Sequence, residues 1–116
     1  MGISATVVSD FSSGAQTPPP VYGFGASQCA TFLNDIRLHP EAKAFYFSWA
    51  QGFISSANEL MPGGVPNLTA SLNEDAQQSA LVDICKQNPG EDFSRASIQL
   101  LDRIRISGGL KPILNQ

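Results

Sequence analysis

Two cysteines carry the chemistry that most constrains this chain. Cys29 and Cys85 lie far apart in the sequence, and they can form a disulfide, remain two inert buried thiols or act as a reactive pair. The spacing does not favour a metal site, because two distant thiols and one distant histidine lack the close ligand pairs of zinc sites. We favour a disulfide, which would stabilise the fold by about 4 kcal/mol and place the protein outside the cytosol.

Other reactive residue types show no catalytic arrangement. His39 is the only histidine, and it directly precedes Pro40 at an expected helix start, so we interpret it as a loop or capping residue. Gly23 and Gly25 precede a helix, but a phosphate-binding loop would need a third glycine and a Lys-Ser/Thr ending. Most carboxylates fall on polar helix faces or in first turns, as solvation and helix dipoles require. We expect a non-enzymatic protein with no catalytic residue and no cofactor.

Composition narrows the class of partner. The chain has 116 residues, seven Lys and Arg against ten Asp and Glu, and a net charge of −3. Binding to nucleic acid or to an anionic membrane needs clustered cations, which are missing. No apolar segment is long enough to insert into a bilayer. The remaining candidates are a protein partner and self-association, and no metal is expected.

The two ends of the chain differ in composition from the middle. Residues 1–21 are rich in Ser, Gly and Thr and include the run Pro18–Pro20, so we expect a disordered or extended leader. This leader lacks the basic and apolar regions of a signal peptide. Either the native chain is cytosolic, or a signal peptide has been removed; the cysteines favour the second explanation and a periplasmic or secreted location. Residues 107–116 are expected to be a flexible tail.

Residues 22–106 have the patterning of an all-α domain. Helices are expected at about 27–38, 40–60, 73–86 and 91–106, in a compact bundle closed by one disulfide. Ser27 and Asn73 fit as N-caps of the first and third helices. Helical spacing places the following residues in the core: Cys29, Phe32, Leu33, Ile36, Ala80, Leu81, Ile84, Cys85, Phe93, Ala96, Ser97, Leu100, Leu101 and Ile104.

The second helix is the most aromatic stretch, and we expect it at the centre of the bundle. Phe45, Trp49, Phe53 and Ser56 form one stripe at helical spacing, which predicts the buried face. The stripe is widened by Tyr46, Ala50 and Ala57, so the helix is apolar round more than half its circumference. Gly52 interrupts the helix at a cost near 1 kcal/mol, and its expected use is the close approach of another helix.

A second set of residues consists of candidate contacts for a protein partner. Tyr46 and Phe47 lie off the centre of the aromatic stripe and would become candidates if they reached the surface. The loop after the second helix contains two Pro residues and two Gly residues and should be exposed. Met61, Val65 and Leu68 are its large apolar side chains and complete the candidate set.

Several motifs together resemble a known group of proteins. They are Gly-x-Gly-x-x-x-Cys at 23–29, Trp49–Ser55 followed by Asn58, Cys-x-x-Asn-Pro at 85–89, and an apolar helix from about 93–96. In layout, residues 22–106 resemble small exported bacterial proteins of the HdeA-like kind and are similar to the Rap1a/Tai immunity proteins.

The resemblance implies an all-helical periplasmic domain with a disulfide from the first to the third helix, here Cys29–Cys85. HdeA is an acid-activated chaperone, whereas Rap1a/Tai proteins bind and block a peptidoglycan amidase. Seven Lys and Arg and one His give only mild self-repulsion once the carboxylates are protonated. This departure from the acid chaperone favours a stable binding domain, and the loop at 61–71 is the best candidate for blocking an active site.

Overall fold

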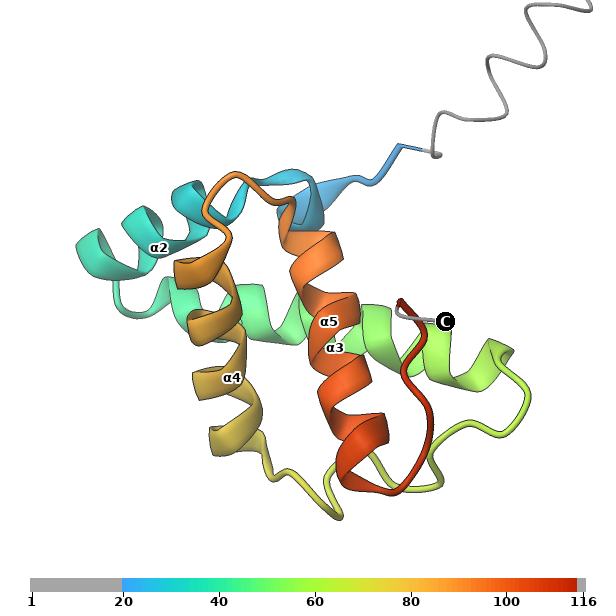
Figure 1. Ribbon diagram of the computed structural model, residues 1–116. Helices are drawn as coiled ribbons and strands as arrows, with labels where there is room; N and C mark the ends of the chain where they lie inside the picture. Colours follow the sequence, from blue (N-terminus) through green and yellow to red (C-terminus); the bar gives the residue numbers. More distant parts are fainter. Residues whose placement is uncertain (1–19, 115–116) are drawn as a thin grey trace, which may run out of the picture.

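The computed structural model describes residues 20–114. Within this range the chain forms four α-helices and one short 3-10 helix, which are joined by loops (Figure 1). They are listed in chain order: η1 (Gly23–Ala26), α2 (Cys29–Leu38), α3 (Ala42–Leu60), α4 (Glu74–Gln87) and α5 (Phe93–Ser107). The all-α prediction with one disulfide is confirmed. The predicted leader falls almost entirely on residues 1–19, outside the described residues, as do the last two residues of the predicted tail.

The starts of α2 and α5 are joined by main-chain hydrogen bonds. The amides of Cys29 and Ala30 donate to the carbonyls of Glu91 (2.7 Å) and Pro89 (2.8 Å), and the amide of Phe93 donates to Ser27 (2.7 Å). Gln28 and Asp92 form an isolated antiparallel bridge within the described chain. Amides in the first turn of a helix have no partner inside the helix, so each segment satisfies donors at the start of the other helix.

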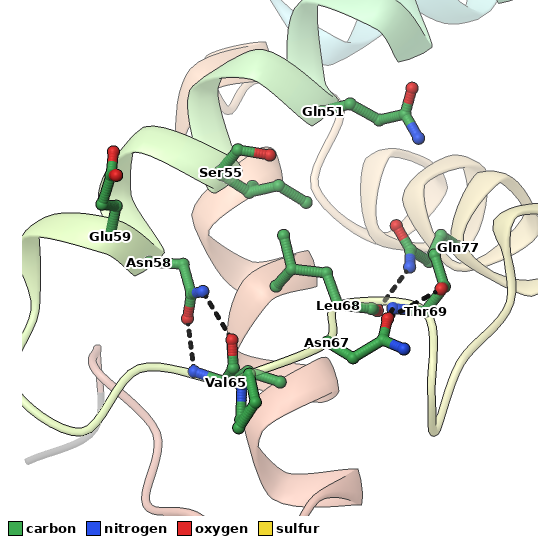
Figure 2. A pocket seen from close by; sticks show the side chains of 11 residues that line it. Gln51, Ser55, Asn58, Glu59, Val65, Asn67, Leu68, Thr69 and Gln77 are labelled. Carbon is green, nitrogen blue, oxygen red and sulfur yellow. Dashed lines mark hydrogen bonds between the residues drawn. The ribbon is translucent and has the colours of Figure 1, made fainter.

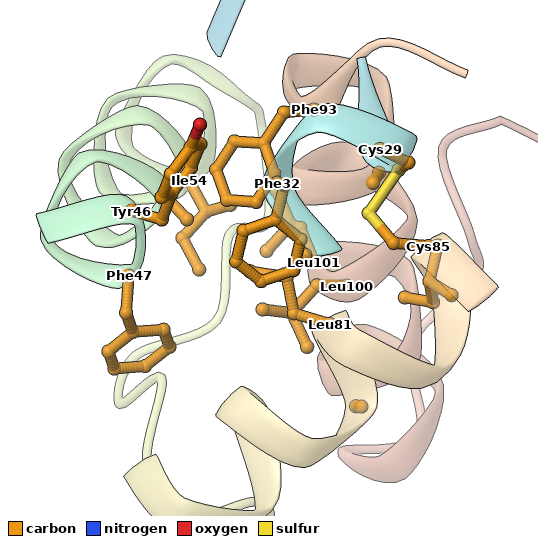
Figure 3. Close-up of a cluster of buried hydrophobic side chains, with 14 of the residues drawn as sticks. Cys29, Phe32, Tyr46, Phe47, Ile54, Leu81, Cys85, Phe93, Leu100 and Leu101 are labelled. Atoms are coloured by element: carbon orange, nitrogen blue, oxygen red, sulfur yellow. A yellow bond between two sulfur atoms is a disulfide. The ribbon is translucent and has the colours of Figure 1, made fainter. Parts of the chain in front are cut away.

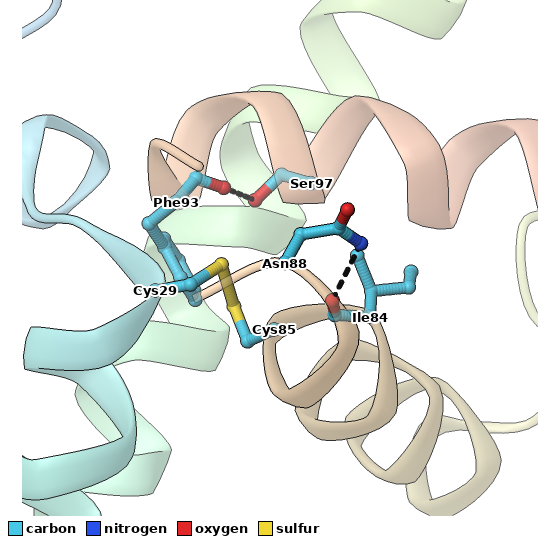
Figure 4. Close-up of a disulfide and its surroundings, with 6 residues drawn as sticks. All are labelled: Cys29, Ile84, Cys85, Asn88, Phe93 and Ser97. Carbon is cyan, nitrogen blue, oxygen red and sulfur yellow. Dashed lines mark hydrogen bonds between the residues drawn. A yellow bond between two sulfur atoms is a disulfide. The ribbon is translucent and has the colours of Figure 1, made fainter. Parts of the chain in front are cut away.

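The disulfide lies directly beside these bonds. Cys29 and Cys85 are fully buried, and their Cα atoms are 4.9 Å apart (Figure 4). The bond therefore ties the last turn of α4 to the same place. We call the segments 27–30 and 89–93, together with Cys85, the helix junction.

Two predicted N-caps have opposite outcomes. Asn73 caps α4 as expected, because its Oδ1 accepts from the amide of Ala76 at 2.9 Å. Ser27 as a cap of α2 is wrong: α2 begins at Cys29 after Gln28, and no side chain caps it. The carbonyls of Glu91 and Pro89 already accept hydrogen bonds from the amides of Cys29 and Ala30 in the first turn of α2, where a capping side chain would otherwise act.

The centre of the bundle is α5, not α3. Nine residues of α5 are buried, and this helix packs against α2, α3, α4 and η1. Phe93 lies at the middle of an aromatic group, with its ring centroid 4.8 Å from Phe32 and 5.0 Å from Tyr46 (Figure 3). The prediction of a central second helix was wrong, because α3 crosses behind α4 and α5 as an outer element (Figure 1). The predicted core faces of α4 and α5 are confirmed.

The predicted buried face of α3 was only partly right: Tyr46 and Ala50, expected at the margin of the stripe, are buried, but the centre line of the stripe is not the buried line. The buried residues are Tyr46, Phe47, Ala50 and Ile54, whereas Phe45 is 61% exposed. In addition, Ser56 is exposed, and Trp49 and Phe53 are half-buried. Aromatic residues occupy more than one side of this helix, so helical spacing alone does not select the face that packs. The contacts with α5, η1 and α2 select it.

The segment after α5 folds back onto the helix. Asp102 is only 6% exposed, and its carboxylate accepts from the amides of Ile113 and Leu114. Arg105 is equally buried and donates from Nε to the carbonyl of Lys111 at 2.8 Å. The segment expected as a flexible tail therefore contacts α5 as far as Leu114. Sequence patterning placed Asp102 on a solvated face, whereas backbone amides of the returning chain cover its carboxylate.

The close approach that the sequence predicted at Gly52 is found at Gly25 instead. Gly25 lies against the Trp49 ring, and a Cβ at this position would overlap the ring atoms. Gly52 is exposed, and a Cβ there would meet nothing within 4 Å. The glycine that permits close packing on α3 is therefore Gly25, while Gly52 leaves its side of α3 open.

Alanine at these two positions should have opposite effects on stability. We expect Gly52→Ala to raise the free energy of unfolding by about 1 kcal/mol, because Ala is the better helix former. Gly25→Ala should lower it and shift Trp49 fluorescence, because the ring must move. Urea denaturation at low protein concentration, monitored by this single Trp, measures both effects. A stabilising Gly25→Ala variant would contradict the packing of Gly25 on Trp49.

Candidate functional site

An open groove lies between the second half of α3, the loop that follows it and the start of α4 (Figure 2). Its volume is about 460 Å³. Most of its lining residues are polar and uncharged, and the full set is Gln51, Ile54, Ser55, Asn58, Glu59, Val65, Pro66, Asn67, Leu68, Thr69 and Gln77. We call it the α3–loop groove.

Asn58 fixes the first half of the loop to the end of α3. Its Oδ1 accepts from the amide of Val65 at 2.6 Å, and its Nδ2 donates to the carbonyl of the same residue at 2.8 Å. The side-chain amide thus pairs with the loop as a neighbouring strand would. Gly64 makes this approach possible, because a Cβ there would overlap the Asn58 carbonyl.

Gln77 fixes the second half of the loop from α4. Its side chain is buried, and Nε2 donates to the carbonyls of Leu68 (2.8 Å) and Leu72 (2.7 Å). Between these points, Asn67 accepts through Oδ1 from the amide and the hydroxyl of Thr69, at 3.0 and 2.9 Å. The loop is therefore held from both sides and also by its own side chains.

The wall that α3 contributes is a row of polar side chains. Gln51, Ser55 and Glu59 are spaced by four residues, which places them on one side of the helix. Glu59 is the only charged residue of the lining. The neutral amides and hydroxyls of this wall, together with one carboxylate, can donate and accept hydrogen bonds. Catalysis by a pair of titratable groups, one acting as acid and one as base, would need a second such group in the groove beside Glu59.

The five predicted partner contacts do not form one surface. Val65 and Leu68 line the α3–loop groove and are half-buried, and Met61 is half-buried at the end of α3 without lining it. Tyr46 and Phe47 lie in the core, at 2% and 5% exposure, so the condition that they reach the surface is not met.

Tyr46 has a structural partner instead. Its hydroxyl donates to Oδ2 of Asp35 at 2.6 Å, which joins α2 to α3. Burial, followed by this hydrogen bond, raises the pKa of Tyr46 above its ordinary value of 10.0. The phenol is thus held in its neutral form as part of the core.

Sequence reasoning missed the residues that shape the groove. Asn58 appeared in a family motif without an assigned role, and Gln77 gave no signal, because a Gln on a helix is normally exposed. Gln51 and Glu59 were not singled out either. Their common role depends on the return of the loop over α3, which no local pattern predicts.

The remaining candidates for chemistry stay apart from this site. His39 is exposed between α2 and α3, with Nδ1 3.8 Å from a Glu41 carboxylate oxygen. Within residues 20–114, no three His, Cys, Asp or Glu side chains gather where they could hold a metal ion. No helix in that range is long and apolar enough to cross a membrane.

Comparison with known proteins adds no relative. The chain matches no protein-family model, no curated protein and no solved structure. The resemblance to HdeA-like and Rap1a/Tai proteins therefore stays a prediction from sequence motifs.

Replacing Asn58 should loosen the loop without unfolding the domain. Asn58→Asp keeps an acceptor for the Val65 amide but loses the donor to the Val65 carbonyl, so we expect a loss of about 1 kcal/mol. Asn58→Ala removes both bonds and should also increase the hydrogen-exchange rate of the Val65 amide. Unchanged protection of that amide in Asn58→Ala would contradict the proposed clamp.

Proposed function

We propose that this chain is an exported protein-binding domain of the HdeA-like kind, without enzymatic activity. Its contact surface is the α3–loop groove together with the adjoining loop. The observation that carries this proposal is the fixation of the loop by Asn58 on one side and Gln77 on the other. A loop already held in one conformation loses little entropy when a partner binds.

The disulfide supports export. Cytosolic thiols are kept reduced, whereas structural disulfides persist in the periplasm and outside the cell. Cys29–Cys85 closes a sequence separation of 56 residues and is completely buried. A bond at this position is well suited to a small domain that has to stay folded after export.

The character of the groove supports a protein partner. Small-molecule pockets are mostly apolar and enclose their ligand, whereas this groove is open and lined mainly by neutral polar side chains. Val65 and Leu68 add apolar contact area to its lining. Protein interfaces combine such polar and apolar groups, and they use far fewer cations than nucleic-acid sites.

The alternative is an immunity protein of the Rap1a/Tai kind, whose partner would be a peptidoglycan amidase. Two observations favour it over an acid-activated chaperone. The loop is rigidly held, as a blocking segment should be. In addition, the chain has only seven Lys and Arg and one His, so charge repulsion at low pH is a weak drive to unfold.

The acid response separates the two roles. An acid chaperone should lose its near-ultraviolet circular dichroism at pH about 2–3 and suppress light scattering by a client enzyme denatured at that pH. An immunity protein should stay folded there and form a tight 1:1 complex with a peptidoglycan amidase that is the product of an adjacent gene. A chain that stays folded at low pH excludes the chaperone role.

The contact surface is tested in the complex. Leu68→Glu should weaken binding to the amidase at least about tenfold, because it places a charge in the lining of the groove. Thr31→Glu, on the exposed side of α2, is the control and should leave the affinity unchanged. Equal affinity of both variants would reject this groove as the contact surface.

Two free thiols in protein isolated from its native host would remove the basis for export.

A further inference from the structure

A second cleft lies between α2 and the C-terminal half of α4, next to the helix junction. Figure 1 shows α2 beside this end of α4, to which the Cys29–Cys85 bond ties it. The cleft has a volume of about 560 Å³. We call it the α2–α4 cleft. Three apolar and three polar side chains line it: Leu33, Asn34, Ile36, Arg37, Val82 and Lys86.

The apolar residues of the α2–α4 cleft are only partly covered. Leu33, Ile36 and Val82 each pack against the core on one side, and each is half-buried. An apolar side chain of another molecule placed on them would remove further apolar surface from water, which is favourable in proportion to the area covered.

Two cations line the same cleft without an anionic partner. Arg37 and Lys86 are exposed, and the one ion pair in the described part of the chain joins His39 and Glu41 instead. The Arg37 guanidinium is nevertheless held in place, because its Nη2 donates to Oδ1 of Asn34 at 2.7 Å. The chain as a whole has a net charge of −3. Two unpaired cations beside an apolar surface are therefore a local exception.

Neighbouring carboxylates do not neutralise these cations. Asp35 accepts the Tyr46 hydroxyl at 2.6 Å on the side of α2 that faces α3. Asp83, on α4, is exposed and does not line the cleft. Cations in the last turn of a helix are favourable on their own, since they oppose the negative end of the helix dipole. That effect explains the positions of Arg37 and Lys86, but it does not explain the apolar surface left open beside them.

We propose that the α2–α4 cleft binds a short acidic segment of a partner protein. One apolar side chain of that segment packs on Leu33, Ile36 and Val82, and the carboxylates beside it pair with Arg37 and Lys86. Hydrogen bonds between a guanidinium and a carboxylate are charge-assisted and directional. Because the chain as a whole is acidic, such a segment is attracted at the two cations and repelled elsewhere, which restricts it to this site.

Other anionic ligands fit this cleft less well. Nucleic acid and anionic membranes need a larger cluster of cations than two. Small molecules bind in pockets that enclose most of their surface, whereas this cleft is open. A peptide segment can cross an open cleft and place a single side chain in it, so a protein segment is the occupant that the shape and the charge favour together.

This inference goes beyond the proposed function and does not rest on it. The α3–loop groove includes Gln77 in the first turn of α4, whereas the α2–α4 cleft includes Lys86 in the last turn. The two sites share no lining residue. One chain can therefore hold a protein segment at each site, and each site can fail its own test without the other.

Nuclear magnetic resonance titration of the complete isotope-labelled chain with the peptide acetyl-Glu-Leu-Leu-Glu-amide tests the proposal. Few atoms make contact, so we expect weak binding, with a dissociation constant on the order of 1 mM. The largest shifts should fall on the amides of Leu33, Arg37, Val82 and Lys86. The neutral peptide acetyl-Gln-Leu-Leu-Gln-amide should bind at least about fivefold more weakly, because it lacks the carboxylates.

Charge reversal tests the roles of the two cations. Arg37→Glu and Lys86→Glu should each weaken binding of the acidic peptide at least about fivefold. Both variants should stay folded, because these side chains are exposed, and circular dichroism checks this. Arg103→Glu makes the same change in net charge at an exposed position of α5 and is the control. Its affinity should stay within about twofold of the wild type, since distant charges are screened.

Four results would overturn the proposal. They are the absence of shifts at the cleft up to about 10 mM acidic peptide, equal affinity for the acidic and the neutral peptide, and equal weakening by Lys86→Glu and Arg103→Glu. The fourth is co-sedimentation with phosphatidylserine vesicles that is lost in Lys86→Glu, which would assign the cleft to a lipid surface instead.

Discussion

The helix junction is the constraint on which the rest of this structure depends. At one place, α2 and α5 exchange main-chain hydrogen bonds through Cys29, Glu91, Ser27 and Phe93, and the Cys29–Cys85 bond adds the end of α4. A helix start buried without partners for its amides would be costly. Here each helix start is satisfied by the segment that precedes the other, so the three helices are fixed in position together.

The helix α5 connects the helix junction to the elements that form the α3–loop groove. Phe93 begins the helix in contact with Phe32 of α2 and Tyr46 of α3, so α3 is placed by the same aromatic group. At the far end of α5, Arg105 donates to the carbonyl of Lys111 and reaches that of Gly63 at 3.5 Å. The returning C-terminal segment and the loop that borders the α3–loop groove are thus attached to one side chain. The groove is thus connected to the disulfide through α5 and also through α4, which carries both Gln77 and Cys85.

The sequence predicts the elements better than their faces. The cap at Asn73 and the core faces of α4 and α5 follow from local spacing, because polar and apolar residues segregate clearly there. On α3, aromatic residues on several sides allow more than one buried face, and only contacts from η1, α2 and α5 decide between them. Asp102, Arg105 and Gln77 are polar residues whose burial depends on backbone groups brought back by a loop or by the C-terminal segment. The periodicity of apolar residues in a helix does not predict hydrogen bonds to backbone groups that are distant in sequence. The polar residues that shape the groove were missed for this reason.

Urea denaturation of the double variant Cys29→Ala/Cys85→Ala, combined with amide hydrogen exchange, tests the central role of the helix junction most directly. We expect the double variant to lose about 4 kcal/mol in the free energy of unfolding, and we expect the amides of Cys29, Ala30 and Phe93 in the wild type to be among the slowest to exchange. In the double variant these three positions should lose protection together. A free energy of unfolding within about 0.5 kcal/mol of the wild type, with unchanged protection at the junction, would contradict this central role.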